Sequence, residues 1–361
     1  MTTDVWVDAA TLRDVAGALL RAAGATDEDA GIAAAVLIAS DLRGHESHGV
    51  SRLERYYVRP LLAGKIKARP QAVVRHETAA TIVIDADNGL GQPAAAKAMD
   101  RCIAKARDAG ICIATIKHSN HFGIAGYYAM QALAHDMIGF ASTDAGPLAV
   151  PTGGRMAMFG SNPIAFAAPA RRRRPFVLDM ATSAVPVGKV EVKERRGIPL
   201  PPGWAVDADG QPTGDATAVL AGLGRGLPGG LMPLGGSEAG HKGYGLAMMV
   251  EILCSVLAGP RAHLGDPHAF SADEPHDVNH TVAAIDIAAF GSADEFKSSM
   301  DAYIEGMQRS APVAGVDRVR VAGEPEFEAE DERLRRGVPL HESTAASLRA
   351  LGAELGVEPR F

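Results

Sequence analysis

The sequence predicts an α/β protein that opens with a helical lobe. Apolar residues recur at helical spacing through residues 8–43, and from residue 80 onward short apolar runs alternate with helical stretches. Parallel strands joined by crossover helices are the simplest assembly of that alternation. The 361 residues suffice for two or three lobes around at least one sizeable core.

The opening lobe is expected to contain three helices. Asp8 precedes the first and Thr26 the second, and both residue types cap helix N-termini. We expect the second helix to end near Leu42 and a third, short helix to cover residues 51–62.

Strands and helices then alternate along the chain. The expected strands are 80–85, 111–116, 138–142, two in the segment 162–183, 280–287 and 318–321. The expected helices are 93–109, 125–134, 243–257, 293–308, 326–336 and 343–355, the last of which should return to the N-terminal lobe. Residues 198–236 are rich in Gly and Pro and are expected to be loop. Because the helix at 243–257 is apolar all round, we expect it to be buried between layers.

Composition and charge exclude several classes of protein. A net charge of -7 argues against a general nucleic-acid binder. The acidic N-terminal segment does not resemble a signal peptide, and no run of about 20 apolar residues predicts a membrane span. The 3 cysteines form no C-x-x-C pair, which favours reduced thiols in a cytoplasmic protein.

The densest polar cluster is the segment 44–52 (GHESHGVSR), between two expected helices. A Ser47 hydroxyl beside His48 can orient the imidazole and assist proton transfer, and Arg52 can bind a carboxylate through two hydrogen bonds. The alternative interpretation is an exposed polar turn with a helix cap. The combination of residue types between glycines favours function.

A second cluster, residues 117–123 (KHSNHFG), directly follows an expected strand. The carboxyl ends of strands border the ligand crevice in open α/β sheets, so His121 is suited to acid–base work or to contact with a nicotinamide. The alternative is a turn in which backbone groups satisfy His121.

The two clusters also contain the spacings His45/His48 and His118/His121, which permit a metal-dependent hydrolase as a rival hypothesis. The spacing i, i+3 places two ligands on one helix face less well than i, i+4, and no H-E-x-x-H occurs. We therefore expect no metal site.

Other segments have structural and functional interpretations. The Gly89–Gly91 turn imitates a dinucleotide fingerprint, but Lys117 and His118 stand where the ribose-binding acid would be, so we interpret it as a strand-to-helix turn. The run 171–174 (RRRR) is interpreted as a solvated hairpin tip. Asp179 and Thr182 close an apolar strand and are equally compatible with a cofactor contact or a capped strand end. Lys242 lies among glycines at an expected helix start, a position suited to phosphate.

Taken together, the motifs resemble the malate/L-lactate dehydrogenase family. The resemblance spans nearly the whole chain and rests on the motifs DLRGHESHGVSRLERY (41–56), SNHFGIAGYYA (119–129), GSNPIAFAAP (160–169), LDMATSAVPVGKV (178–190), IPLPPGWAVDADGQPT (198–213) and GHKGYGLAMMVEIL (240–253). Several long motifs in the same order are more specific than any single spacing.

The resemblance implies a non-Rossmann α/β fold peculiar to the family, with a mixed sheet and an inserted cofactor-binding lobe. Residues 1–78 would form a helical lobe packed with 325–361. Residues 79–120 would form an α/β core continuing in 309–324, and residues 121–308 the cofactor-binding lobe. It also implies a homodimer with sites near the subunit interface.

The same resemblance implies NAD(P)-dependent interconversion of a 2-oxo acid, or a related cyclic imine, with its reduced form. Four positions match catalytic ones in the family: Ser47, His48, Arg52 and His121. The expected cofactor contacts are Ala145, Asp179, Met180, Ala181, Thr182, Lys242, Gly323 and Glu324. Two departures concern the cofactor contacts: Asp144-Ala145 where relatives often carry small polar residues, and Ala322 where many have Pro.

In the expected mechanism, hydride adds to the C2 carbonyl, His48 polarised by Ser47 protonates the developing alkoxide, and Arg52 holds the carboxylate. His121 shares the proton role or orients the substrate. We expect NAD or NADP as cofactor and favour NAD. The remaining alternative, a non-catalytic ligand-binding homologue, is disfavoured by the intact triad of Ser47, His48 and Arg52.

Overall fold

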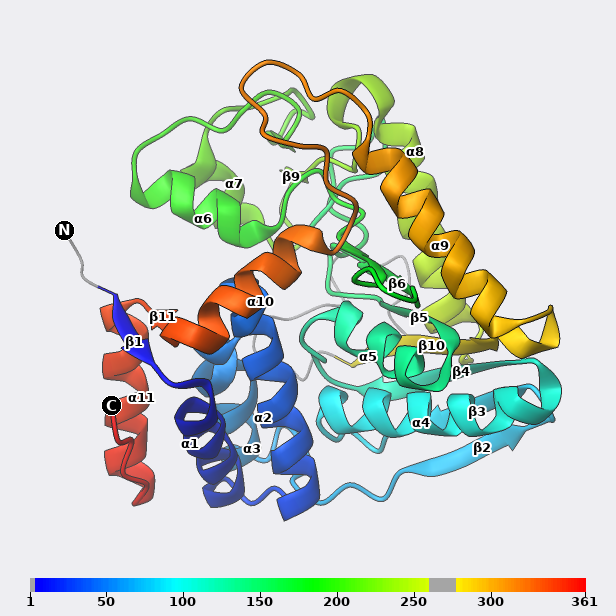
Figure 1. The fold of residues 1–361 in the computed structure, drawn as a ribbon. Coiled ribbons are helices and arrows are strands. Elements are labelled where there is room, and N and C mark those ends of the chain that lie inside the picture. Colours follow the sequence, from blue (N-terminus) through cyan, green and yellow to red (C-terminus); the bar gives the residue numbers. More distant parts are fainter. Residues whose placement is uncertain (1–3, 260–276) are drawn as a thin grey trace.

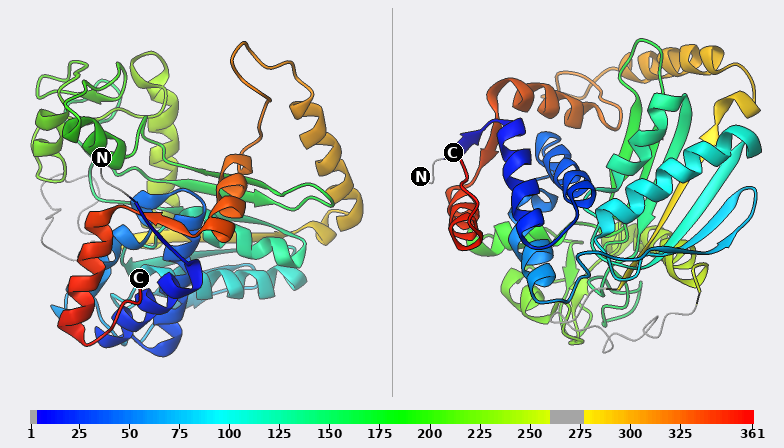
Figure 2. Two further views of the ribbon diagram at one scale, coloured as in Figure 1. Left: turned by 60° about the vertical axis from the view of Figure 1, so that its left-hand side comes forward. Right: turned by 90° about the horizontal axis from the view of Figure 1, so that it is seen from below.

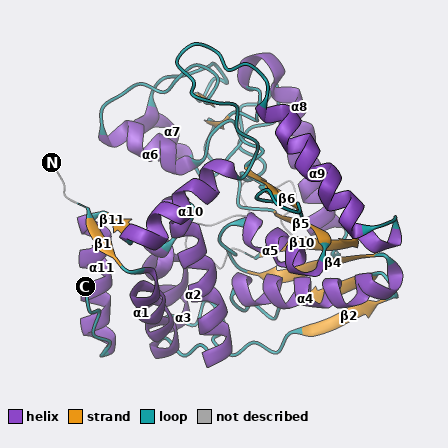
Figure 3. Cartoon of the chain, viewed as in Figure 1, coloured by secondary structure: helices purple, strands orange, loops and turns teal. Residues whose placement is uncertain are grey.

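A computed structural model of the chain describes residues 4–259 and 277–361 (Figure 1). A mixed sheet carries helices on both faces, and a separate helical lobe packs at one side (Figure 3). The expected α/β class with a helical N-terminal lobe and a mixed sheet is confirmed. None of the helices in the described ranges is long and apolar enough to cross a membrane.

The helical lobe combines the two ends of the chain. It contains α1 (Ala9–Ala22), α2 (Asp27–Leu42) and α11 (Glu342–Leu355). The Asp8 and Thr26 side chains cap α1 and α2 as expected, accepting from Thr11 N and Asp29 N. Leu12, Leu37 and Leu348 share one apolar core, which confirms that the last helix returns to this lobe.

A short antiparallel pair of strands closes the lobe. The strand β1 (Val5–Val7) pairs with β11 (Val338–Leu340), and neither was predicted. Both strands are only three residues long, too short for a periodicity signal. Figure 2 shows β1 and β11 side by side next to α11.

The third helix of the lobe is confirmed but irregular. It begins with a 3-10 turn at Val50–Arg52, continues as a π-helical segment at Leu53–Val58 and ends as α3 (Arg59–Leu62).

The large sheet has seven strands in the order β2-β3-β4-β10-β5-β6-β7. Their bounds are β2 (Val73–Glu77), β3 (Thr81–Asp85), β4 (Ile111–Ser119), β5 (Met137–Thr143), β6 (Ile164–Ala168), β7 (Phe176–Met180) and β10 (Val278–Asp286). Only β3 and β4 pair in parallel. β10 inserts antiparallel between β4 and β5, so those two strands share a direction without pairing. The parallel pairing that was the simplest interpretation of the alternating segment therefore holds for β3 and β4 but not for β4 and β5.

Two helices cover one face of this sheet. α4 (Gly91–Ala109) and α5 (Ala125–Gln131) pack on it, and Met137 and Ala141 of β5 face their shared core. The alternate residues of β5 point the other way, so Phe140 and Ser142 meet the side of the sheet that carries α8 (Gly236–Glu251). This alternation places α8 on the opposite face.

The run at 171–174 forms the tip of the β6–β7 hairpin, as expected. The Asp301 carboxylate of α9 (Ala293–Gln308) accepts the backbone N–H groups of Arg171, Arg172 and Arg173 at 3.0–3.1 Å. The arginine side chains themselves are exposed.

The stretch 198–236 is more regular than predicted. It contains β8 (Ala205–Val206), α7 (Ala216–Gly222) and β9 (Gly230–Leu231), and α6 (Val187–Arg195) precedes it unpredicted. Asp215 caps α7 by accepting from Ala218 N at 3.0 Å. These elements are short and separated by glycines, so their periodicity is not readable.

The helix expected at 243–257 begins earlier and is not fully buried. It comprises α8 (Gly236–Glu251) and a π-helical segment, Ile252–Val256, while Pro260 of its expected stop signal lies outside the described residues. Met248, Ile252 and Val256 are 47%, 52% and 53% exposed, so the expected burial between layers is wrong for a single chain. One face of the helix packs on the sheet, and the other carries these exposed side chains.

The strand expected at 318–321 is also wrong. Arg318 and Arg320 bind carboxylates of the neighbouring helix α10 (Glu324–Arg336) and form no ladder hydrogen bonds in the described residues. The proposed lobe boundaries at 78/79, 120/121 and 308/309 stay a prediction.

Candidate functional site

The first candidate cluster, residues 44–52, is a tightly anchored turn after α2. The buried carboxylate of Asp41 accepts the Val50 N–H at 2.9 Å. The Ser40 hydroxyl donates to the His45 carbonyl at 2.8 Å. These two bonds tie both ends of the turn to the last residues of α2.

The second cluster leaves the carboxyl end of β4, as its sequence position predicts. His118 has φ 53°, and Gly91 at the start of α4 packs so closely that a Cβ on it would lie 2.0 Å from the Asn120 carbonyl oxygen. The Gly89–Gly91 turn therefore serves close packing, and this packing positions His121.

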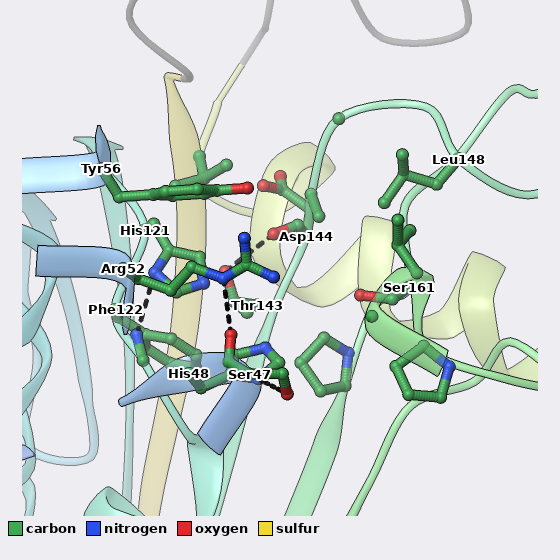
Figure 4. A pocket seen from close by; sticks show the side chains of 18 of the residues that line it. Ser47, His48, Arg52, Tyr56, His121, Phe122, Thr143, Asp144, Leu148 and Ser161 are labelled. Atoms are coloured by element: carbon green, nitrogen blue, oxygen red, sulfur yellow. Dashed lines mark hydrogen bonds between the residues drawn. The ribbon is translucent and has the colours of Figure 1, made fainter. Parts of the chain in front are cut away.

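The two clusters meet in one pocket of about 240 Å³ (Figure 4). His48 and His121 stack with ring centroids 5.6 Å apart, although they are 73 residues apart in the chain (121 − 48). The pocket is lined by Ser47, His48, Arg52, Tyr56, His121, Phe122, Gly123, Thr143, Asp144, Ala145, Gly146, Leu148, Ser161, Pro163, Pro186, Val187, Gly188, Glu191 and Val278. All four residues expected to be catalytic lie there.

His48 is a neutral imidazole held by its neighbour. The Ser47 hydroxyl lies 2.9 Å from His48 Nδ1. Burial, together with the smaller effect of the charges of Arg52 and His45, lowers the pKa of His48 to about 4. At neutral pH this ring can accept a proton.

Arg52 points its guanidinium into the same space. Its Nε donates to the Ser47 carbonyl at 2.7 Å, and its cation lies 5.3 Å from the centre of the Tyr56 ring. A guanidinium nitrogen approaches Glu191 of α6 at 4.0 Å, where both side chains are partly exposed. A substrate carboxylate binding Arg52 must therefore compete with Glu191.

Contacts to its Nδ1 atom fix the orientation of the His121 ring. Its Nδ1 lies 2.5 Å from the Tyr57 hydroxyl, and Gly123 N–H approaches the same atom at 3.4 Å. The Tyr56 ring meets its edge at a centroid distance of 5.2 Å. Neither Tyr56 nor Tyr57 was predicted as a site residue, because adjacent tyrosines in a helical stretch have the pattern of ordinary core residues.

A buried polar network supports the far wall of the pocket. Asp144 accepts the Asn279 N–H at 2.8 Å and the Ser255 hydroxyl. Below it, Thr143 Oγ1 lies 2.7 Å from His280 Nδ1. Burial lowers the pKa of His280 to about 3, so this ring is neutral and structural. The polar run Asn279, His280 and Thr281 at the start of an expected apolar strand was the available signal for it.

The remaining pocket wall is mostly apolar. It is formed by Leu148, Pro163, Pro186 and Val187, with Ala145 and Gly188 beside them. A flat, weakly polar ring such as a nicotinamide fits a wall of this chemistry opposite two histidines. Of the expected cofactor residues, Ala145 lies in this pocket.

The expected cofactor contacts at the end of β7 and directly after it lie outside the pocket lining. Asp179 accepts the N–H of Gly126 in α5 at 2.7 Å, and burial raises the pKa of this carboxyl. The Thr182 hydroxyl donates to the backbone carbonyls of Ser161 and Asn162 at 3.1 Å. Met180 and Ala181 connect Asp179 to Thr182. The hydrogen bond from Thr182 holds the backbone of Ser161, which lines the pocket.

Lys242, Gly323 and Glu324 are likewise apart from the pocket lining. Lys242 is exposed on α8. Gly323 has φ 93° and packs on β7, where a Cβ would lie 2.9 Å from that of Val177. Burial alone would raise the pKa of Glu324, but hydrogen bonds from Val321 N–H and Arg318 leave it lowered.

In each of the two H-x-x-H pairs, only the second histidine lines the pocket. His48 and His121 reach the pocket, whereas His118 turns to Asp85, with its Nδ1 3.0 Å from the carboxylate. Within residues 4–259 and 277–361, no cluster of three or more His, Cys, Asp or Glu side chains is arranged to hold a metal.

Comparison with known proteins gives a consistent result. A family model described as malate/L-lactate dehydrogenase matches residues 7–349. The chain is 41% identical to a malate dehydrogenase of Pyrococcus abyssi over 339 residues, which is 93% of this chain and 91% of the relative. It is 36% identical to a (2R)-3-sulfolactate dehydrogenase (NADP(+)) of Chromohalobacter salexigens, covering 81% and 84%. A crystal structure of malate dehydrogenase from Entamoeba histolytica superimposes with a TM-score of 0.94 at 30% identity, over 99% of this chain and 100% of that one.

Proposed function

The chain belongs to the malate/L-lactate dehydrogenase family and is an oxidoreductase of 2-oxo and 2-hydroxy acids, and we propose that the pocket between His48 and His121 is its active site. The single observation that carries the proposal is the convergence of Ser47, His48, Arg52 and His121 from two distant segments. We also propose cyclic imine acids as a second substrate class, because one solved relative, 29% identical, is a delta1-piperideine-2-carboxylate reductase of Pseudomonas syringae.

In this proposal Arg52 binds the substrate carboxylate. Its guanidinium is oriented by the Ser47 carbonyl, so its outer nitrogens are available for two parallel hydrogen bonds. This contact turns C2 of the acid toward the two histidines.

His48 transfers the proton at the C2 oxygen. Its neutral ring accepts the hydroxyl proton when a 2-hydroxy acid is oxidised, and the adjacent Ser47 hydroxyl orients the ring. In the reverse direction, a substrate carboxylate on Arg52 offsets the positive charge that disfavours the imidazolium, so substrate binding raises the pKa of His48.

The nicotinamide cofactor, when bound, accepts or supplies the hydride at C2. We propose that the wall at Ala145, Leu148 and Ser161 holds its ring, and that Asp179, Met180, Ala181, Thr182, Lys242, Gly323 and Glu324 serve the rest of the cofactor directly or by bracing that wall. We favour NAD, while one relative's name specifies NADP(+).

We further propose a cytoplasmic homodimer. The exposed apolar side chains of α8 and of the π-helical segment that follows it, among them Met248, Ile252 and Val256, support an interface between copies.

A panel of 2-oxo acids and cyclic imine acids, assayed with NADH and NADPH in parallel, tests the function. His48→Ala should abolish turnover while NAD(P)H fluorescence still reports cofactor binding. His45→Ala is the matched control, because His45 lies outside the pocket lining, and it should retain turnover. Near-normal turnover in His48→Ala would show that His48 does not transfer the proton.

A further inference from the structure

Two polar groups, the Tyr57 hydroxyl and the Gly123 N–H, approach one nitrogen of His121. The Tyr57 hydroxyl lies 2.5 Å from Nδ1, and the backbone N–H of Gly123 lies 3.4 Å from the same atom. A backbone N–H can only donate, so Nδ1 must act as an acceptor. A neutral imidazole that accepts at Nδ1 carries its proton on Nε2.

The Gly123 contact is built into the fold. Gly123 has φ 81°, and a Cβ on it would lie 2.7 Å from Val36 of α2. This close approach fixes the backbone of the turn against the helical lobe, and it keeps the Gly123 N–H beside the ring.

Tyr57 is equally constrained. It is fully buried, and burial raises the pKa of its hydroxyl well above the usual value, so the group stays protonated and can donate. The fully buried Gln92 amide faces the Tyr57 hydroxyl and favours its ionised form slightly. Among the described residues, neither polar atom of the Gln92 side chain has a hydrogen bond of standard geometry.

We propose that Tyr57 is a positioning residue that holds His121 in the Nε2–H tautomer, so that His121 donates a hydrogen bond to the C2 oxygen of the substrate while His48 transfers the proton. The assignment rests on the proposed function of this pocket, and it gives the two stacked histidines different roles.

The surroundings of His48 suit proton transfer, and those of His121 suit a fixed hydrogen-bond donor. His48 has a hydroxyl of its own neighbour on Nδ1 and lies beside Arg52, which acts on its proton affinity. His121 has a tyrosine and a backbone amide on Nδ1, which orient the ring. A neutral, preoriented N–H donor stabilises negative charge as it develops on the carbonyl oxygen.

The tautomer of His121 is directly measurable. In ¹⁵N-labelled protein, long-range ¹H–¹⁵N correlations distinguish Nε2–H from Nδ1–H, and the His121→Gln variant identifies the signals. We expect the Nε2–H pattern in the wild type. A wild-type spectrum with the proton on Nδ1 overturns the proposal whatever the variants do.

The variant Tyr57→Phe removes the hydroxyl and keeps the ring. It should mix the two tautomers and lower kcat about 10-fold to 100-fold, as loss of an orienting partner does, with KM changed less than about 2-fold. Tyr127→Phe is the control, because Tyr127 is partly buried on α5 and does not line the pocket, and it should leave both kcat and the spectrum unchanged.

A Tyr57→Phe enzyme with wild-type kcat and an unchanged tautomer contradicts the proposal. Failure of the proposed function is a separate outcome: the wild type would then oxidise no NAD(P)H with any acid of the panel, whereas the tautomer measurement needs no turnover.

Discussion

The carboxylate of Asp41 occupies the space where a side chain on Gly49 would lie. A Cβ on Gly49 would approach Asp41 Oδ1 to 1.8 Å, while Oδ2 of the same carboxylate accepts the Val50 N–H at 2.9 Å. Asp41 is only 2% exposed. The glycine and the buried acid thus form one unit that holds the turn bearing Ser47, His48 and Arg52.

Gly49→Ala should therefore damage both stability and activity. The methyl group cannot fit without displacing Asp41, so we expect a loss of about 2–4 kcal/mol in the free energy of unfolding. Because the turn moves with it, kcat/KM should fall at least about 100-fold. Urea unfolding and steady-state kinetics measure the two effects.

Gly31→Ala is the matched control. Gly31 lies on α2 with no atom within 4 Å of an added Cβ, so alanine there should be neutral or stabilise by up to about 1 kcal/mol. If Gly49→Ala behaves like Gly31→Ala, the close approach of Asp41 and Gly49 does not exist.

Asp41→Asn should change how stability depends on pH. Burial raises the pKa of Asp41 to about 7, against about 4 in an unfolded chain. Between these values the folded state binds a proton that the unfolded state has lost, so stability falls as pH rises, by up to about 1.4 kcal/mol per pH unit. Asparagine cannot titrate and still accepts the Val50 N–H.

Urea unfolding of both proteins at pH 5, 6, 7 and 8 checks this. The stability of the wild type relative to Asp41→Asn should fall between pH 5 and pH 7 and level off above. Parallel curves for the two proteins would mean that Asp41 titrates normally.

Local features of this fold could be predicted from the sequence, and long-range pairings could not. Asp8 and Thr26 cap their helices as expected because a cap involves only the next three residues. The insertion of β10 between β4 and β5 depends on a segment about 140 residues away from β5, and no local pattern encodes it.

In the site, too, the local motifs could be predicted from the sequence and the long-range contacts could not. The segments bearing His48 and His121 carry readable motifs, and both reach the pocket. Tyr57, which contacts His121 across 64 residues of sequence, has the apolar spacing of a core residue. Its role follows only from the fold that brings α4, β4 and the helical lobe together.

Glu191→Gln should strengthen substrate binding. Glu191 approaches the Arg52 guanidinium at 4.0 Å and must be displaced by the substrate carboxylate. Since exposed ion pairs contribute roughly 0.2–1 kcal/mol, KM for the 2-oxo acid should fall by up to about 5-fold while kcat is unchanged. Glu194→Gln on the same helix is the control and should leave KM unchanged. An unaltered or raised KM in Glu191→Gln would exclude competition between Glu191 and the substrate.

The lowered pKa of His48 predicts opposite pH dependences for the two directions of the reaction. Oxidation of a 2-hydroxy acid needs the neutral ring, which predominates above a pKa of about 4, so kcat/KM should be flat from about pH 5 upward and fall only below about pH 4. Reduction needs the protonated ring, so its kcat/KM should fall about 10-fold per pH unit above that pKa. The two trends agree with thermodynamics, because reduction consumes a proton and the ratio of the two kcat/KM values must change with pH by the same factor. Initial rates in both directions between pH 4 and pH 9 measure this, and an acid limb for oxidation centred near pH 6.5 would show that His48 titrates as an ordinary, solvated histidine.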